Sequence, residues 1–148
     1  MVLLWWLLVA SPGYAQSTPE EKPVVDVATL VSFKNAVASG DPAVVAAIVD
    51  FPLAGSSHMV GRSFSGGGAT RAEFIAHFQA IFSDVVCAKI ATSTDADLVA
   101  IELDGTPAQR LMIHTVSQRG DFEVEFSIGF VFRTTAGGLR LVALQTAG

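Results

Sequence analysis

The chain is 148 residues long, and 51% of its residues are apolar and 16% charged. This composition excludes intrinsic disorder and fits one domain with a buried core. The formal net charge of −5 disfavours a nucleic-acid partner, because the phosphate backbone attracts basic surfaces. One cysteine, Cys87, excludes an intramolecular disulfide framework and a zinc cage built from cysteines. Packing must therefore supply the stability.

The first residues have the pattern of a cleaved export signal. Residues 2–10 (VLLWWLLVA) carry no charge or polar group, but the run is shorter than the ~20 residues of a membrane-spanning helix. Gly13 and Ala15 stand where signal peptidase accepts small residues. We expect residues 1–15 to be a signal peptide, although no Lys or Arg precedes the apolar run, and residues 16–25 to be a mobile leader. The alternative is a buried N-terminal strand or helix.

The remaining chain, residues 26–148, is expected to form a single domain that begins with two helices. Asp26 is a candidate N-cap for the first helix, and Gly40 supplies a left-handed residue that ends it. Asp41, followed by a proline at the first helical position, begins a second helix that runs until Pro52. The apolar residues that indicate the two helices are Leu30, Phe33, Ala36 and Val37, then Val44, Val45, Ile48 and Val49.

A third helix is predicted after an irregular segment. Residues 53–65 fit no period and are expected to hold a short strand or hairpin, followed by a flexible link at 66–68. Thr70 and Glu73 then have the spacing of a capping box, in which each side chain accepts a hydrogen bond from the other residue's backbone. One face of the helix that follows is aromatic and contains a histidine; it comprises Phe74, His77, Phe78, Ile81 and Phe82.

The second half of the chain alternates with a period of two, which predicts strands. The plainest pattern places Phe122, Val124, Phe126, Ile128, Phe130 and Phe132 on one face and Glu123, Glu125, Ser127 and Arg133 on the other. Gly129 in this strand predicts a bulge or a bend. Further strands are expected over 99–103, 110–117 and 139–145, and residues 85–90 are left open as another.

Helices followed by an antiparallel meander with one apolar face predict an α+β domain. We expect three N-terminal helices packed on a strongly curved, mainly antiparallel sheet of four to six strands, a cone or half-barrel. The aromatic strand should then dominate the interface between sheet and helices, because aromatic side chains bury the largest areas.

Short segments of the chain resemble a recurrent pattern in exported bacterial members of the nuclear transport factor-like (cystatin-like α+β cone) superfamily. They are Phe33-Lys34-Asn35-Ala36-Val37, Gly40-Asp41, Val49-Asp50-Phe51-Pro52-Leu53 and the residues from Glu73-Phe74 to Ile81-Phe82. The resemblance covers roughly residues 26 to 146 and implies a cone-shaped α+β fold. It leaves function open, because the superfamily includes isomerases, dehydratases, cyclases and non-catalytic binding domains. Its enzymes place a carboxylate or histidine inside the cone, and no such motif transfers here residue by residue.

Three ionisable residues are candidates for chemistry. His77, on the aromatic helix face, would be neutral if buried and able to accept a proton as a general base. The structural alternative is a histidine that is hydrogen-bonded to a backbone carbonyl. Asp50, at the predicted end of the second helix, would either project into a cavity opening or be solvated. His114, on the strand face of Met112 and Val116, is hypothesised to meet His77 across the gap between sheet and helices.

We expect no metal and no cofactor. His58, His77 and His114 do not have the local spacing of zinc ligands. Glycines 66–68 fit an anion cradle less well than a flexible loop, and Glu123 and Glu125 are interpreted as solvated. The expected ligand pocket is the aromatic one, lined by Phe74, His77, Phe78, Met112, Phe126 and Phe130.

The sequence thus predicts an exported domain, periplasmic or secreted, without an evident catalytic motif. We expect it to bind a small apolar molecule or to dock a protein partner, as a monomer or homodimer, with no nucleic acid and no membrane span after processing. The alternative is a small-molecule isomerase or dehydratase that uses His77 as its general base in the aromatic pocket.

Overall fold

The computed structural model describes residues 27–55 and 68–147. The predicted signal peptide and leader, the candidate cap Asp26, His58 and most of the segment predicted as a strand or hairpin lie outside the described residues. None of the helices within the described ranges combines the length and the hydropathy of a membrane-spanning segment.

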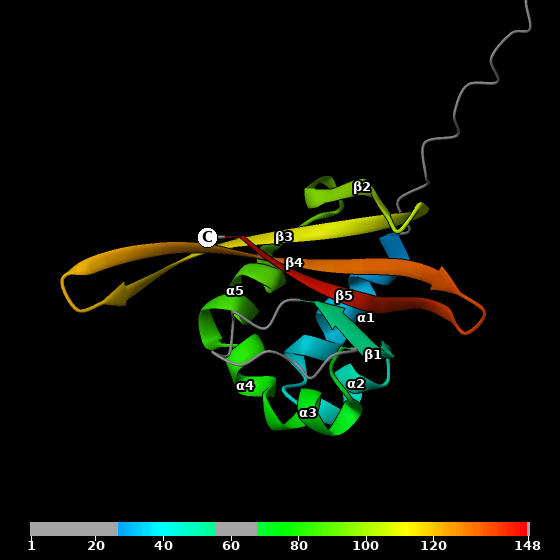
Figure 1. Cartoon of the computed structure of the whole chain (residues 1–148), viewed down its shortest axis with the longest axis horizontal. Helices are drawn as coiled ribbons and strands as arrows, with labels where there is room; N and C mark the ends of the chain where they lie inside the picture. The colour runs from blue at the N-terminus through cyan, green and yellow to red at the C-terminus, as the bar shows by residue number, and fades with distance from the viewer. Residues whose placement is uncertain (1–26, 56–67, 148) are drawn as a thin grey trace, which may run out of the picture.

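Short helices form one layer of the domain (Figure 1). Helix α1 begins the described chain, and α2 follows with Asp41 as its N-cap, whose side chain accepts a hydrogen bond from the backbone of Ala43. Helix α3 has the predicted capping box, with both reciprocal hydrogen bonds between Thr70 and Glu73. The bounds are Val27–Ala38 for α1, Pro42–Ala46 for α2, Arg71–Ala76 for α3, Phe78–Ile81 for α4 and Asp84–Thr92 for α5, followed by the 3₁₀ turn Asp95–Asp97.

A five-stranded sheet forms the other layer, with the strand order β1-β5-β4-β3-β2. Strand β1 pairs with β5 in parallel, and every other pairing is antiparallel. The strands are β1 (Val49–Gly55), β2 (Leu98–Leu103), β3 (Thr106–Arg119), β4 (Phe122–Thr135) and β5 (Gly138–Ala147). The predicted α+β class is confirmed, and helices that cover one face of a mainly antiparallel sheet are the arrangement that the resemblance implies.

The helix layer differs from its prediction in three places. The second helix ends at Ala46 instead of near Pro52, because residues from Val49 onward pair with β5. The third helix is interrupted at His77, yet Phe74, Phe78 and Phe82 still pack against one another. Residues 85–90, left open as a strand, belong to helix α5, whose N-cap Ser83 accepts a hydrogen bond from the backbone of Val86.

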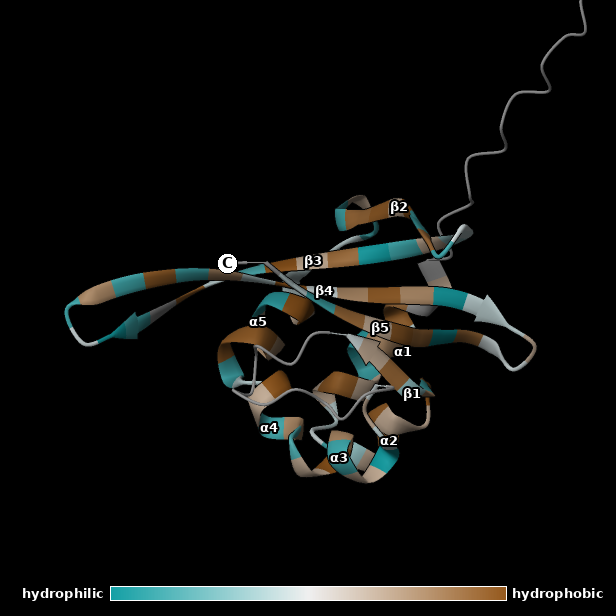
Figure 2. Cartoon of the chain, in the orientation of Figure 1, coloured by the Kyte–Doolittle hydropathy of each residue, from teal (hydrophilic) through white to brown (hydrophobic). Residues whose placement is uncertain are grey.

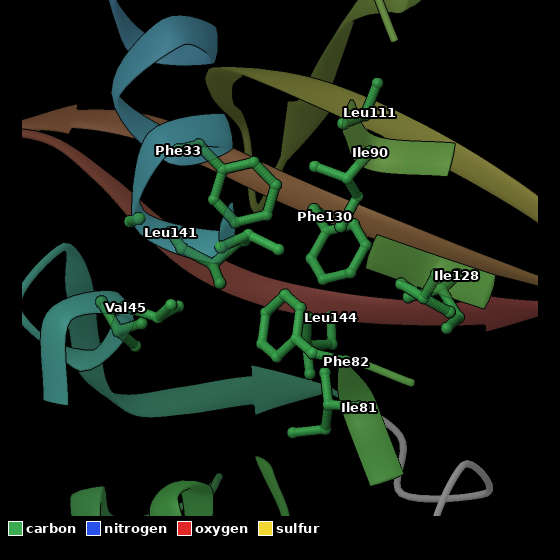
Figure 3. Close-up of a cluster of buried hydrophobic side chains, with 14 of the residues drawn as sticks. Phe33, Val45, Ile81, Phe82, Ile90, Leu111, Ile128, Phe130, Leu141 and Leu144 are labelled. Carbon is green, nitrogen blue, oxygen red and sulfur yellow. The ribbon is translucent and has the colours of Figure 1, made fainter. Parts of the chain in front are cut away.

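An aromatic cluster fills the space between the sheet and the helices (Figure 3). Phe33 of α1 lies with its ring centroid 5.3 Å from that of Phe130 and 5.0 Å from that of Phe132. Phe82 stacks on Phe130 at 5.5 Å with an interplanar angle of 21°. Phe33, Phe82, Phe130 and Phe132 are each at most 2% exposed, so this face of β4, which we call the inner face, forms the core.

The helices cover only part of the inner face. From Ile128 onward the apolar residues of β4 are buried, but Phe122 is 76% exposed and Val124 is 39% exposed. The hairpin of β3 and β4 extends past the helices as an arm (Figure 1), which we define as residues 114–127. The expectation that helices roof the whole aromatic strand is therefore wrong for its first residues, because the strand is longer than the helix layer.

The structure has no bulge at Gly129, and the nearest irregularity is an extra residue in β5. Between β4 and β5 the register shifts between Val131 and Phe132, which leaves Val142 without a partner residue opposite. Gly129 keeps regular pairing with Met112 on one side and Gln145 on the other. The glycine therefore has a different role, which is to leave room for the stem of Arg110 on the second face of the sheet.

Candidate functional site

The predicted catalytic candidates do not form one site. His77 is half-buried at the junction of α3 and α4, and Asp50 is exposed on β1. His114 is exposed, and its Nδ1 lies 2.6 Å from the Oγ of Ser127. No hydrogen bond or ion pair within the described part of the chain joins any two of these three residues.

The hypothesis that His114 meets His77 is wrong, because the two lie on opposite sides of the sheet. His114 pairs with Ser127, and paired residues in antiparallel strands share a face. Ser127 alternates with Phe126 and Ile128, whose neighbours in β4 face the helices. We call the second face, which carries His114 and Ser127, the outer face.

The expected ligand pocket is divided in the same way. Phe74, Phe78 and Phe130 are buried in the aromatic cluster, at most 3% exposed, and Phe126 packs half-buried at the edge of that core. Met112 lies on the outer face, since it pairs with Gly129, and contributes to a different hollow. The structure thus brings three of the six residues together as packed core and separates Met112 from them.

The described residues contain no cluster of three or more His, Cys, Asp or Glu side chains that would hold a metal ion. One thiol is perturbed: the pKa of Cys87 is raised above its ordinary value, mainly because burial disfavours the thiolate and also because the Asp84 carboxylate is close. The Sγ of Cys87 donates to the carbonyl oxygen of Phe82 at 3.5 Å. The thiol is therefore a packed group and a weakened nucleophile.

A groove of about 570 Å³ crosses the outer face. Its lining comes from β3, from β5 and from the ends of β1 and β2; the residues are Ala54, Gly55, Leu103, Asp104, Arg110, Met112, Ala143, Leu144, Gln145 and Thr146. Gly129 of the central strand β4 pairs with Met112 on one side and with Gln145 on the other. Small or apolar residues continue the surface, because Ala108, Val131 and Ala143 form a second apolar cluster on this face. The volume lies within the range of roughly 300–1,000 Å³ that is usual for small-molecule sites.

Arg110 lies beside the position left by Gly129. A Cβ atom added to Gly129 would stand 3.0 Å from Cδ and 3.3 Å from Cγ of Arg110, so only glycine leaves the arginine stem its present place. The Nη1 of Arg110 donates to the Oε1 of Gln145 at 3.1 Å. The guanidinium forms no ion pair with a described residue, and its buried Nε has no acceptor among them.

A wall of the groove comes from the hairpin of β2 and β3. The guanidinium of Arg133 donates through Nη2 to the carbonyl oxygen of Leu103 at 2.6 Å, which ties the end of β2 to β4. Leu103 and Asp104 line the groove there, and Asp104 is exposed in the turn with a positive φ of 52°. The charged residues that line the groove are thus Arg110 on the sheet and Asp104 on the rim.

Two smaller hollows differ from the groove in their chemistry. One, of about 280 Å³, is lined by Phe33, Phe132, Leu141 and neighbours without any charged residue. The other, of about 210 Å³, includes Arg133, but that guanidinium is already hydrogen-bonded to Leu103. The groove beside Gly129 differs from the first hollow because it contains a cation, and from the second because it is larger.

Sequence reasoning missed this site, although one of its signals was present. A turn at Arg119-Gly120-Asp121 fixes the register that places Met112 opposite Gly129. Strands β4 and β5 pair in one register from Thr135 to Phe132. Without the bulge at Val142, that β4–β5 register would place Leu144 opposite Gly129. The bulge instead places Gln145 opposite Gly129, and no local sequence pattern predicts the bulge.

No family model and no curated protein matches this sequence. Two solved structures are similar to it in fold. One is described as a calcium/calmodulin-dependent protein kinase II association domain from Xanthomonas campestris, which is 13% identical with a TM-score of 0.48 and covers 80% of this chain and 81% of that chain. The other is Rd1NTF2_05 with five substitutions, 12% identical with a TM-score of 0.43, covering 81% and 94%. Neither similarity bears on what this chain binds.

Proposed function

We propose that the protein is an exported domain that binds a small molecule on the outer face of its sheet without transforming it. The observation that carries this proposal is the groove at Gly129, where Arg110 and Gln145 provide polar groups between apolar walls. Small-molecule sites typically combine a mostly apolar surface with a few placed polar groups. The inner face contributes stability instead, because its rings are already packed against one another.

Binding fits the chemistry of the groove better than catalysis does. General acid–base catalysis needs a group that exchanges protons near neutral pH, and an arginine guanidinium stays protonated. Asp104 is the other charged lining residue, and it is exposed in a turn. The isomerase or dehydratase alternative requires a partner for His77, and neither Asp50 nor His114 is hydrogen-bonded or ion-paired to it in the described residues.

Native mass spectrometry of the mature protein, purified from its export compartment, tests this proposal. We expect a retained small molecule in the wild type, its loss in Met112→Trp, which fills the groove, and its retention in Val116→Trp. Val116 is a matched control because it lies on the same face of β3, is 53% exposed and does not line the groove. Retention of the same molecule in Met112→Trp, or loss in His77→Gln alone, would contradict the outer-face assignment.

The same preparation tests export. Cleavage after Ala15 would give a chain that begins at Gln16, and its intact mass distinguishes this product from the full chain. Recovery of the protein only in the cytoplasm, with residues 1–15 still attached, would contradict the export part of the proposal.

A second candidate function, docking of another copy of the chain, is supported by the arm. Phe122 and Val124 form an exposed apolar stripe on one side of the β3–β4 hairpin. Apolar and polar segments alternate along the ribbon of this hairpin in Figure 2. Two identical stripes related by a two-fold axis would cover each other. Light scattering during size-exclusion chromatography should show a dimer that Phe122→Ser converts to a monomer, and a monomeric wild type would remove this candidate.

A further inference from the structure

We infer that the ligand of the outer groove is a small monocarboxylate with an apolar tail, held at its carboxylate by Arg110 and Gln145. The inference rests on the proposed function, since it names the ligand class of the same groove. It follows from three features of the groove: an unpaired cation, a neighbouring amide donor and apolar walls.

The cation is the first feature. Arg110 is half-buried, and a charge that is partly removed from water is stabilised by an opposite charge. Among the described residues, Arg110 donates a hydrogen bond to the neutral amide oxygen of Gln145. No described carboxylate forms an ion pair with Arg110. A planar guanidinium matches a carboxylate in geometry, because two parallel N–H donors meet the two oxygens.

The amide of Gln145 is the second feature. Its Oε1 accepts from Nη1 of Arg110, and this orients the amide so that its NH₂ group remains as a donor. Gln145 and Arg110 come from strands on either side of β4, and the stem of Arg110 lies over Gly129, where a side chain would otherwise stand. An anionic group in the groove beside Arg110 and Gln145 would thus be within reach of both a cation and a neutral donor.

The walls and the charge count define the rest of the ligand. Met112, Leu103 and Ala143 present apolar surface along the groove, which favours a hydrocarbon tail. A single cation suits a single negative charge, whereas a phosphate dianion would bring a second charge for which the lining residues provide no further cation. The net charge of −5 further disfavours ligands with several negative charges.

Isothermal titration calorimetry with octanoate and its neutral analogue octanamide tests the inference on the full mature chain. We expect the wild type to bind octanoate at least about tenfold more tightly than octanamide, because hydrogen bonds to a charged group are the stronger ones. Arg110→Met, which keeps the apolar stem, should weaken octanoate far more than octanamide and so remove this preference. Arg110→Lys should keep part of the preference, and Asp104→Asn should leave octanoate binding equal or tighter.

The variants separate this inference from the proposed function. If Met112→Trp abolishes binding of both probes while Arg110→Met leaves the preference for octanoate intact, the groove stands and the carboxylate assignment is overturned. If the wild type binds octanoate and Met112→Trp does not weaken this binding, the assignment of the ligand to the groove is wrong. Failure of the wild type to bind octanoate also overturns the inference. Urea denaturation of each variant confirms that loss of binding is not loss of folding.

Discussion

The two faces of one β-sheet differ in what their side chains do. On the inner face Phe130 is fully buried and its ring contacts those of Phe33 and Phe82. On the outer face, one residue earlier in the same strand, Gly129 leaves room for the stem of Arg110, which borders a groove together with Met112 and Gln145. Alternation along a strand thus turns successive residues toward the core and toward the outer surface.

The comparison shows why an aromatic surface is a poor guide to a pocket in this fold. Aromatic side chains bury large areas and pack against each other, so a helix face and a strand face that are both aromatic fill the space between them. A small residue in a central strand does the opposite, because it removes volume where both neighbouring strands are fixed. The groove therefore lies beside a glycine and not between the aromatic faces.

The largest expected effect is on the inner face. Phe130→Ala should lower the free energy of unfolding by about 3–5 kcal/mol, because it leaves a cavity among packed rings. Phe122→Ala, a change of the same chemistry on the same strand, should alter it by less than about 0.5 kcal/mol, since Phe122 is 76% exposed. Urea denaturation measures both, and similar losses in the two variants would contradict the division between core and arm.

A smaller loss is expected in the helix layer that covers the inner face. Thr70→Ala removes the hydroxyl that accepts from the backbone of Glu73 at 3.2 Å, and loss of such a cap costs about 1 kcal/mol. Thr70→Ser keeps a hydroxyl and should restore most of this loss in urea denaturation. Octanoate affinity should be the same in both variants, and a parallel fall in affinity would link the inner layer to binding.

On the outer face, Gly129→Ala should weaken octanoate binding several-fold with little effect on stability. The new methyl group would stand 3.0 Å from Cδ of Arg110, so the arginine stem must shift by a few tenths of an ångström. Gly137→Ala is a matched control, because its methyl would stand 3.0 Å from Nη2 of Arg140, outside the groove. Calorimetry that finds equal affinities for the two variants would exclude a role for Gly129 in placing Arg110.

The smallest effect is the pH dependence of Cys87 on α5. Its raised pKa means that the folded protein keeps the proton over a pH range in which the unfolded chain has lost it. Stability should therefore fall slightly as the pH rises through this range. The pH profile of iodoacetamide labelling should be shifted upward relative to the urea-unfolded chain. Asp84→Asn should reduce the shift only in part, because burial is the larger cause. A labelling profile that is not shifted relative to the unfolded chain would show that the helix layer leaves the thiol accessible to solvent.

Much of the fold could be predicted from the sequence because its signals are local. The capping box of Thr70 and Glu73 and the alternation of β4 each depend on neighbouring residues, and both are confirmed. The shortened second helix could not be predicted, since pairing of β1 with β5 overrides the local helical pattern. The site depended on register: one unpaired residue, Val142, decides that Gln145 and not Leu144 pairs with Gly129.

Titration of the ¹⁵N-labelled mature protein with octanoate, followed by two-dimensional amide spectra, compares the two faces in one experiment. The amides of Gly129 and Gln145 should show the largest chemical-shift changes, and those of Phe74 and Phe82 should stay nearly unchanged. The largest changes at Phe74 and Phe82, with Gly129 unaffected, would place the ligand between the sheet and the helices and contradict an outer binding face.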